Sequence, residues 1–233
     1  MEQARPTLQV AHTADLDPDT LTVVFARRFA AYKRATLLLS QPDRLLALLT
    51  SNERPVQLVV AGKAHPADEL GKRLIQDVVR FSHRPETAGR LVFVSDYDLA
   101  IARTLVRGAD VWLNTPRRPF EACGTSGMKA ALNGALNCSI RDGWWDELYD
   151  GSNGWAIAAE EHAGDDADRD RAEAEHAFRV LESEVVPCFY DDRSRWLAMV
   201  RHSLETLAPI VDARRMVQEY VEELYEPAAM ASR

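Results

Sequence analysis

The chain has 233 residues, 46% of them hydrophobic, which suits one large globular domain or two small ones. Its formal net charge of −8 argues against a general nucleic-acid-binding or anionic-membrane surface, so any anion site must be local. The three cysteines have neither metal-ligand spacing nor a disulfide pattern. No apolar run approaches the roughly 20 residues that cross a membrane, and the N-terminus has no signal-peptide pattern. We therefore expect a cytoplasmic protein without a metal site.

The first 20 residues are polar and contain proline, and we expect residues 1–20 to form an entry linker. Six short apolar runs follow along the chain, at residues 22–25, 56–61, 91–94, 111–113, 136–140 and 155–158. Such runs, rich in valine, leucine and isoleucine, predict β-strands. They are apolar throughout rather than alternating with polar residues, which predicts strands that are buried on both faces.

Segments with helical periodicity lie between these runs. A leucine-rich helix is expected to end at Leu49 and to be interrupted or split by Pro42. Further helices are expected at 66–81 and 99–107, and Gly108 stands where a glycine commonly ends a helix.

Strands that alternate with helices predict an α/β fold over residues 21–160, with a doubly wound, mainly parallel sheet of about six strands. Beyond residue 160 the β pattern stops and helical periodicity continues, so residues 161–233 are expected to form a helical C-terminal extension of the same domain. The acidic run from Glu160 to Glu175 is expected to be a solvated loop and helix face.

One stretch after the fourth predicted strand has the composition of an anion-binding loop. Residues 121–129 (EACGTSGMK) place two glycines and two hydroxyl side chains before a run of good helix formers. A loop that enters a helix in this way leaves backbone N–H groups at the positive helix end, where a phosphate binds well. Gly124 and Gly127 let the backbone approach the anion, and Thr125 can add a hydroxyl donor. Lys129 falls in the first turn, so its amine can lie beside whatever the loop holds.

Polar groups also follow the other predicted strands. Ligands of an open parallel sheet bind outside the carboxyl ends of its strands. The groups at these ends are Arg27 and Arg28 with Lys33, Gly62 and Lys63, Asp96 and Tyr97, and residues 141–144. The cations could form ion pairs with nearby carboxylates or could hold an oxyanion. Their shared placement at strand ends favours an oxyanion site that holds two phosphates.

Several common motifs are absent. No G-x-G-x-x-G follows the first predicted strand, and the spacing around Gly124, Gly127 and Lys129 is too short for a G-x-x-x-x-G-K-[ST] phosphate loop. The sequence has no G-x-S-x-G elbow and no H-E-x-x-H. Of six scattered histidines, His65 alone is at the right edge, and we expect it to be a solvated or capping residue.

Four long stretches occur in a specific order: FARRFAAYKR at 25–34, AGKAHP at 61–66, VWLNTPRRP at 111–119 and EACGTSGMK at 121–129. Together they resemble the α-glucan (glycogen/maltodextrin) phosphorylases, most of all the short bacterial branch. The resemblance continues through 142–145 and 153–157 and covers nearly the whole chain. It implies the C-terminal, cofactor-bearing lobe of a two-lobed GT-B enzyme, with a Rossmann-like fold.

The resemblance also implies roles for the charged residues. The lysine at the position of Lys129 forms a Schiff base with pyridoxal 5′-phosphate in that family. By the same matching, Arg28 and Lys33 would bind the substrate phosphate, and these two are the catalytic candidates. Arg27 would bind the cofactor phosphate, and Tyr97 would lie beside both phosphates.

Other matched residues would contact cofactor or sugar. Gly124, Thr125 and Gly127 would line the phosphate and sugar sites through their backbone N–H groups. Glu121 would accept hydrogen bonds from glucose hydroxyls. Cys123 stands where the family pattern has serine, which would weaken one sugar hydrogen bond.

The implied reaction is the retaining phosphorolysis of α-1,4-glucan by orthophosphate to glucose 1-phosphate. In it, the phosphate of the cofactor rather than its ring assists the chemistry. Two close phosphates repel each other unless cations offset them, which gives the cluster of Arg27, Arg28 and Lys33 a physical reason to exist.

Some features depart from the family pattern. Asp98 stands where the long animal-type enzymes carry arginine, and Ala30 and Ala31 replace their His-Glu, so the phosphate contacts can differ. The family's N-terminal lobe supplies half of the sugar pocket, and nothing in this chain can stand for it. We therefore expect a fragment that is inactive without that lobe. The family also suggests a homodimer, with contacts largely outside this lobe.

Two alternatives remain from the sequence. A GT-B glycosyltransferase lobe that uses a nucleotide sugar typically has a glutamate eight positions after the first glutamate, and here that position is Lys129, which favours pyridoxal phosphate. A non-catalytic carbohydrate-binding module would use exposed aromatic rings for sugar stacking. Its candidates are Trp144, Trp145, Tyr149 and Trp155, although core packing is the favoured role for them.

Overall fold

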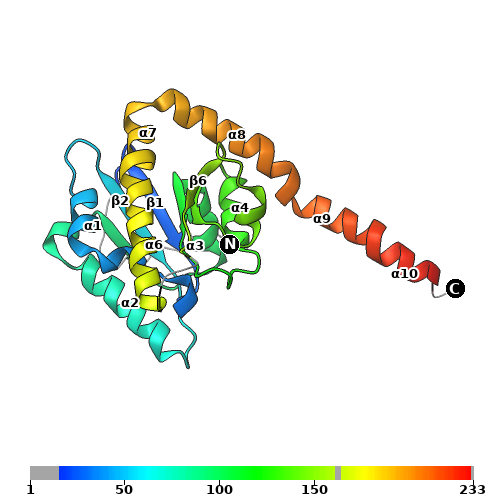
Figure 1. Cartoon of the computed structure of the whole chain (residues 1–233), viewed down its shortest axis with the longest axis horizontal. Coiled ribbons are helices and arrows are strands. Elements are labelled where there is room, and N and C mark those ends of the chain that lie inside the picture. Colours follow the sequence, from blue (N-terminus) through cyan, green and yellow to red (C-terminus); the bar gives the residue numbers. More distant parts are fainter. Residues whose placement is uncertain (1–15, 161–163, 232–233) are drawn as a thin grey trace, which may run out of the picture.

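The computed structural model describes residues 16–160 and 164–231 (Figure 1). Six strands form one sheet in the order β3-β2-β1-β4-β5-β6, and every neighbouring pair is parallel. The strands are β1 Leu21–Ala26, β2 Val56–Ala61, β3 Leu91–Val94, β4 Val111–Asn114, β5 Leu136–Ile140 and β6 Gly154–Ile157. The predicted doubly wound parallel sheet is confirmed. β2, β3 and β5 have the predicted bounds, β1 and β4 are slightly longer, and β6 is shifted by one residue.

Helices connect the strands and continue to the end of the described chain. They are α1 Pro42–Leu49, α2 Glu69–Ser82, α3 Leu99–Gly108, α4 Thr125–Ala131, α5 Trp144–Leu148, α6 Asp166–Val180, α7 Val186–Asp191, α8 Arg193–Val211, α9 Ala213–Tyr220 and α10 Glu226–Ala231. Short 3-10 turns form η1 Ala31–Lys33, η2 Leu37–Ser40 and η3 Pro85–Thr87, and π-helical turns form η4 Leu181–Val185 and η5 Val221–Tyr225.

Local chemistry explains where the helices begin. Pro42 is the first residue of α1, where its missing N–H removes no hydrogen bond, so the expected leucine-rich helix is split there. The helix expected from residue 66 begins at Glu69 instead. The reason is Asp68, whose carboxylate accepts from the Gly71 N–H at 2.8 Å and caps the helix.

The strands are buried on both faces, as their composition predicted, and alternate side chains enter two separate cores. On one face, Phe25 and Val60 pack with residues of α1, α2, α6 and η4. On the other face, Val24 and Val59 pack with residues of α3 and α4, among them Val106. Helices therefore cover both faces of the sheet, which is the doubly wound arrangement.

The predicted C-terminal helices are present, and one expectation about this part of the chain is wrong. The acidic run is not wholly solvated, because Glu173 on α6 is completely buried (0% exposed). Beyond α8, helices α9 and α10 extend away from the sheet (Figure 1), and no residue described from 213 to 231 is buried. Among the described residues, no helix is long and apolar enough to cross a membrane.

The expected entry linker lies largely outside the described residues, which begin at 16. Its last part contacts the sheet, since the Asp17 N–H donates to the Gln57 side chain at 2.7 Å. The division at residues 20 and 160 remains a prediction.

Candidate functional site

The strand order places the candidate site where the sheet reverses direction. The chain adds β2 and β3 on one side of β1 and then places β4 on the other side. Connections therefore leave β1 and β4 in opposite directions, which opens a crevice at their carboxyl ends where α/β proteins commonly bind ligands. Arg27 follows β1 at this point, and the loop that contains Glu121 follows β4.

Arg27, Lys33 and Glu121 form a buried ion cluster in this crevice. Arg27 Nη2 donates to Glu121 Oε1 at 2.7 Å, and the Lys33 amine contacts Glu121 Oε2. The three residues are 7, 7 and 8% exposed, respectively. Of the two alternatives for these cations, ion pairing is therefore present for Arg27 and Lys33. These ion pairs do not exclude an oxyanion ligand. The Glu121 carboxylate is itself an oxyanion that both cations bind.

The cluster controls the charge state of Glu121. Burial by itself raises the pKa of this carboxyl, but the charge of Arg27 and hydrogen bonds from Lys33 and Arg27 outweigh burial and hold the pKa below its ordinary value. The Glu121 backbone is also fixed, because its N–H donates to Asp142 Oδ2 at 2.8 Å. Glu121 is therefore an ionised, well-held carboxylate at neutral pH.

A cavity of about 280 Å³ opens beside this cluster. It brings together most of the residues that the sequence singled out, which come from β1, the loop after it, the loop before α3, and the start of α4. Its lining consists of Ala26, Arg27, Arg28, Lys33, Tyr97, Glu121, Gly124, Thr125 and Ser126. Arg28 is exposed, in contrast to Arg27 and Lys33.

A second cavity of about 550 Å³ lies next to the first, and Lys129 is in its wall. The two cavities share Tyr97 and Ser126. Burial raises the pKa of the Tyr97 hydroxyl, with Arg27 opposing this effect, so Tyr97 stays neutral and can donate a hydrogen bond. Lys129, an exposed residue, therefore lines a cavity that borders the cavity of the cationic cluster.

Sequence reasoning missed several residues of this second cavity. Trp112 lines it and donates from Nε1 to Ser126 Oγ at 3.4 Å, while Arg103 and Asn133 complete its polar wall. Asn133 could have been found, because it follows Lys129 by one helical turn. Arg103 carries no local signal, since only the packing of α3 against β1 and α4 brings it near.

The loop enters α4 at Thr125 as predicted, but Lys129 lies in the last turn of this short helix and not in its first turn. Gly124 is the residue before the helix and has a left-handed backbone (φ 88°, ψ 46°), which a residue with a Cβ rarely adopts. Gly127 does not face the cavities as expected from the sequence. It is buried, its N–H donates to the Gly124 carbonyl at 3.1 Å, and a Cβ there would lie 2.6 Å from Asn137 Oδ1. Gly127 therefore allows α4 to pack closely on β5.

The remaining sequence candidates are placed as follows. His65 Nδ1 accepts from the Ala67 N–H at 3.1 Å on an exposed turn, which confirms a capping role. Cys123 is exposed at the rim of the loop, and its carbonyl accepts from the Trp144 N–H at 3.1 Å. Trp144, Trp145 and Trp155 are buried, so their rings pack in the core and are not a sugar-stacking surface. No group of metal-ligating side chains occurs among the described residues.

Comparisons with known proteins agree with this geometry. A family model described as carbohydrate phosphorylase matches residues 2–151. The chain belongs to the carbohydrate phosphorylase family. All residues that line the two cavities lie within the matched region.

Individual members of the family are similar over almost the whole chain. Glycogen phosphorylase of Mycobacterium tuberculosis (strain CDC 1551 / Oshkosh) is 57% identical over 222 residues, which cover 93% of this chain and 26% of the relative. Glycogen phosphorylase of Aquifex aeolicus is 47% identical over 229 residues, covering 96% and 33%. Maltodextrin phosphorylase of Thermococcus litoralis is 46% identical over 214 residues, covering 92% and 26%. The chain thus spans about a quarter to a third of the length of these phosphorylases.

A solved structure shows the same fold at low sequence identity. The crystal structure of Anabaena Alr3699/HepE in complex with UDP and glucose aligns with a TM-score of 0.63 at 18% identity. The alignment covers 89% of this chain and 49% of that chain. This structural similarity shows that the phosphorylase chain has the fold of one GT-B lobe.

Proposed function

We propose that this chain is the cofactor-bearing lobe of an α-glucan phosphorylase, which cleaves α-1,4-glucan with orthophosphate and releases glucose 1-phosphate. One observation carries the proposal. The cavity of Lys129 adjoins the cavity of Arg27, Arg28 and Lys33, and the two share Tyr97 and Ser126. An amine that can hold an aldehyde cofactor therefore lies next to cations that can hold a phosphate.

The residues fit pyridoxal 5′-phosphate. A cavity of about 550 Å³ has the size of small-molecule sites in general. Its wall combines the Trp112 ring with the polar side chains of Ser126, Arg103 and Asn133. Arg27 adds a further donor, because its buried Nη1 has no hydrogen-bond partner among the described residues. When bound, the cofactor would supply a phosphate group that assists proton transfer to and from the substrate phosphate.

The chain's own residues would hold orthophosphate and prepare it for attack. Lys33 and Arg27 offer charge-assisted hydrogen bonds from buried positions, where electrostatic attraction is stronger than in water. Arg28 is exposed on the same cavity and can close over a bound anion. Together these three cations would offset the repulsion between the two phosphates.

Glu121 would link the phosphate and the sugar. In this structure the Glu121 carboxylate forms ion pairs with both Arg27 and Lys33. An orthophosphate that takes over these cations would release Glu121, whose oxygens could then accept hydrogen bonds from glucose hydroxyls. Cys123 is exposed beside it and would contribute only a weak thiol donor to the sugar.

The missing N-terminal lobe is the proposed partner. The chain spans 26% of the mycobacterial relative, and the exposed face of α9, η5 and α10 carries large apolar side chains such as Val217, Leu224 and Tyr225. Exposed apolar faces of this kind commonly mark sites of contact with another protein or domain. We infer that glucan turnover requires the second lobe, which would close the sugar pocket over Glu121.

A nucleotide-sugar glycosyltransferase remains the second candidate, and the structural similarity at 18% identity supports its fold alone. Lys129 opposes it, because an amine stands where that class typically has a carboxylate. Saturable binding of UDP-glucose or ADP-glucose to the chain would favour this candidate, and we expect no such binding.

Borohydride reduction tests the cofactor site. Pyridoxal 5′-phosphate added to the full chain, followed by reduction and peptide mapping, should label Lys129. The exposed Lys63 and the partly exposed Lys72 lie outside this cavity, so they serve as internal controls and should be labelled only at much higher concentration. Lys129→Ala should remove the label and keep the far-UV circular dichroism spectrum of the parent. Equal labelling of all three lysines would overturn the proposed site.

A further inference from the structure

A charged side chain with no assigned role lies directly after Lys33. The Arg34 guanidinium is only 3% exposed, and its backbone is left-handed (φ 51°, ψ 50°), which is unusual for a residue with a Cβ. Burial of a charge costs free energy unless hydrogen bonds and a counter-charge offset it. The partners of Arg34 therefore show what this arrangement holds in place.

These partners come from two distant parts of the chain. Arg34 Nε donates to the Thr115 carbonyl at 2.9 Å, and Nη2 donates to the Pro116 carbonyl at 2.8 Å, so the end of β4 is tied to Arg34. On α6, Nη1 donates to Asp170 Oδ1 at 2.9 Å, and Nη2 forms an ion pair with Glu173. Glu173 is completely buried, and its second oxygen accepts from the Glu160 N–H at 2.9 Å.

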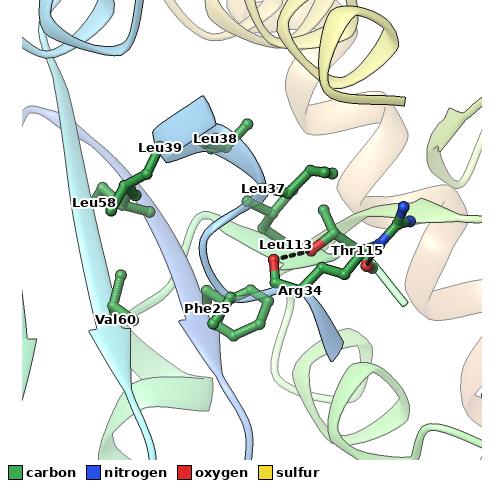
Figure 2. A pocket seen from close by; sticks show the side chains of 10 residues that line it. Phe25, Arg34, Leu37, Leu38, Leu39, Leu58, Val60, Leu113 and Thr115 are labelled. Carbon is green, nitrogen blue, oxygen red and sulfur yellow. Dashed lines mark hydrogen bonds between the residues drawn. The ribbon is translucent and has the colours of Figure 1, made fainter. Parts of the chain in front are cut away.

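The backbone around Lys33 is held from the same side. The Thr115 hydroxyl lies 3.3 Å from the Lys33 carbonyl oxygen and 3.2 Å from the Arg34 carbonyl oxygen, within donating distance of both. Figure 2 shows this contact between Thr115 and the Arg34 backbone, with the Arg34 side chain extending past Thr115. The Arg117 N–H donates to the Tyr32 carbonyl at 2.7 Å. Residues 32–34 are therefore fixed against the loop that follows β4.

We propose that Arg34 and Glu173 form a positioning pair through which α6 holds the Lys33 amine in the anion cavity. This inference rests on the proposed function of Lys33. A lysine side chain has four rotatable bonds, and its amine reaches a fixed point only if its backbone is fixed first. The Lys33 amine contacts Glu121 and lies 4.5 Å from the centre of the Tyr32 ring, and the hydrogen bonds around Arg34 fix the backbone from which this side chain extends. Glu173 lies outside the region matched by the family model, residues 2–151.

Lysine makes a poor substitute for Arg34. A planar guanidinium reaches two backbone carbonyls and two carboxylates at once, whereas an ammonium group has three donors at a single point. Arg34→Lys keeps the charge and should lose part of the geometry. Glu173→Gln keeps the shape and removes the counter-charge. Asp170→Asn changes a partner that is 35% exposed and that Arg34 shares with Arg117, and it should have the weakest effect on the Lys33 signal.

The Lys33 amine can be observed directly by NMR. The chain has four lysines (Lys33, Lys63, Lys72 and Lys129), so the side-chain amine signals are few, and Lys33→Arg assigns the signal of interest. In the parent chain the Lys33 signal should show slow exchange with water, because its amine is buried against Glu121. Arg34→Lys and Glu173→Gln should shift this signal towards that of the exposed lysines. Orthophosphate affinity, measured by calorimetry, should fall on the order of 10-fold.

Arg44→Lys is the matched control. Arg44 also ties α6 and the following turn to the rest of the domain, through ion pairs with Glu175 and Glu182, but none of its hydrogen bonds within the described chain involves residues 32–34 or 115–117. Its replacement should leave the Lys33 signal and the orthophosphate affinity within twofold of the parent values.

The outcomes separate this proposal from the function on which it rests. If the parent chain binds no orthophosphate but Glu173→Gln still shifts the Lys33 signal, the anion site fails and the positioning pair stands. If Arg34→Lys and Glu173→Gln fold and leave both the Lys33 signal and orthophosphate affinity unchanged, the positioning pair is wrong. If both variants fail to fold, the milder Glu173→Asp decides, because it keeps the charge but shortens the side chain, and an unchanged Lys33 signal would overturn the proposal.

Discussion

Lys33 and Glu121 are 88 residues apart in the sequence, yet their charged groups are in contact and both side chains are buried. Glu121 also pairs with Arg27, so one carboxylate neutralises two cations of the proposed anion site. An incoming phosphate must therefore compete with a carboxylate that is already in place. The affinity for phosphate is thus linked to the position of Glu121.

The first prediction follows from this competition. Glu121→Gln removes the negative charge but keeps a side chain of similar shape, so Arg27 and Lys33 lose their counter-ion. Orthophosphate binding to the chain should become tighter, by about 5- to 10-fold, as measured by calorimetry. Glu147→Gln is the control, because it changes the net charge equally at an exposed position on α5. Unchanged or weaker orthophosphate binding in Glu121→Gln would show that Glu121 does not compete with the anion.

The second prediction concerns stability and pH. The pKa of Glu121 is held below its ordinary value of 4.5 in the folded chain, so folding favours the ionised form. The stability that Glu121 contributes should be complete above about pH 4.5 and should be lost as the pH falls through its lowered pKa. The free energy of unfolding of the parent chain should exceed that of Glu121→Gln by about 1–3 kcal/mol at pH 7. This difference should shrink steadily in urea titrations below pH 4.

Asp110→Asn provides a comparison of opposite sign. Burial raises the pKa of Asp110, although the Thr22 N–H and Arg193 oppose this, so folding favours its protonated form. Its contribution should be complete below its ordinary pKa and should fall as the pH rises through the raised value. The difference in free energy of unfolding between parent and variant should change with pH in opposite directions for the two variants. A change in the same direction would contradict the directions of the two pKa shifts.

The fold was predictable because its signals are local. Continuous apolar runs such as 56–61 and 91–94 can only be strands buried on both faces, and the structure gives them those bounds. Helix starts were less certain, because side-chain caps such as Asp68 decide them, and a cap depends on one rotamer. The full burial of Glu173 within an acidic run was not predictable, since its partner Arg34 is distant in the sequence.

The sequence predicted which residues form the site, but not which contacts they make with one another. Parallel strands place their carboxyl ends together, so Arg27, Lys33 and the loop after β4 had to meet. Which carboxylate would pair with which cation depends on side-chain packing across this edge, and sequence spacing carries no information about it. Gly127 shows the same limit, because its small size serves the contact with Asn137 rather than an approach to a ligand.

The third prediction tests this role of Gly127. In Gly127→Ala the new Cβ would lie 2.6 Å from Asn137 Oδ1 and 3.1 Å from the Trp144 ring, so α4 must shift. Overpacking of this kind should lower the free energy of unfolding by about 1–3 kcal/mol and should slow the labelling of Lys129 by pyridoxal 5′-phosphate. Gly108→Ala is the matched control, because nothing lies within 4 Å of its Cβ position. That control should be neutral or stabilising by up to about 1 kcal/mol, since alanine favours a helix.

The last prediction concerns the helices that extend from the domain. Residues such as Met216, Val217, Tyr220 and Leu224 recur at helical spacing and are exposed, between 41 and 57% of each side chain. Since no residue described from 213 to 231 is buried, these helices contribute little to the stability of the domain. Deletion of residue 213 and all that follow should therefore change Tm by less than about 2 °C in thermal unfolding.

The same deletion should abolish association with a separately expressed N-terminal lobe of the phosphorylase, measured by size-exclusion chromatography with light scattering. Val217→Glu with Leu224→Glu should weaken this association as the deletion does, because charges would enter the apolar face. Gln218→Lys places a charge about 100° around the helix from Val217, where it can pair with Glu222, and should leave association intact. A deletion that lowers Tm strongly would show instead that α9 and α10 stabilise this lobe itself, and association that survives the deletion would place the contact between the lobes elsewhere.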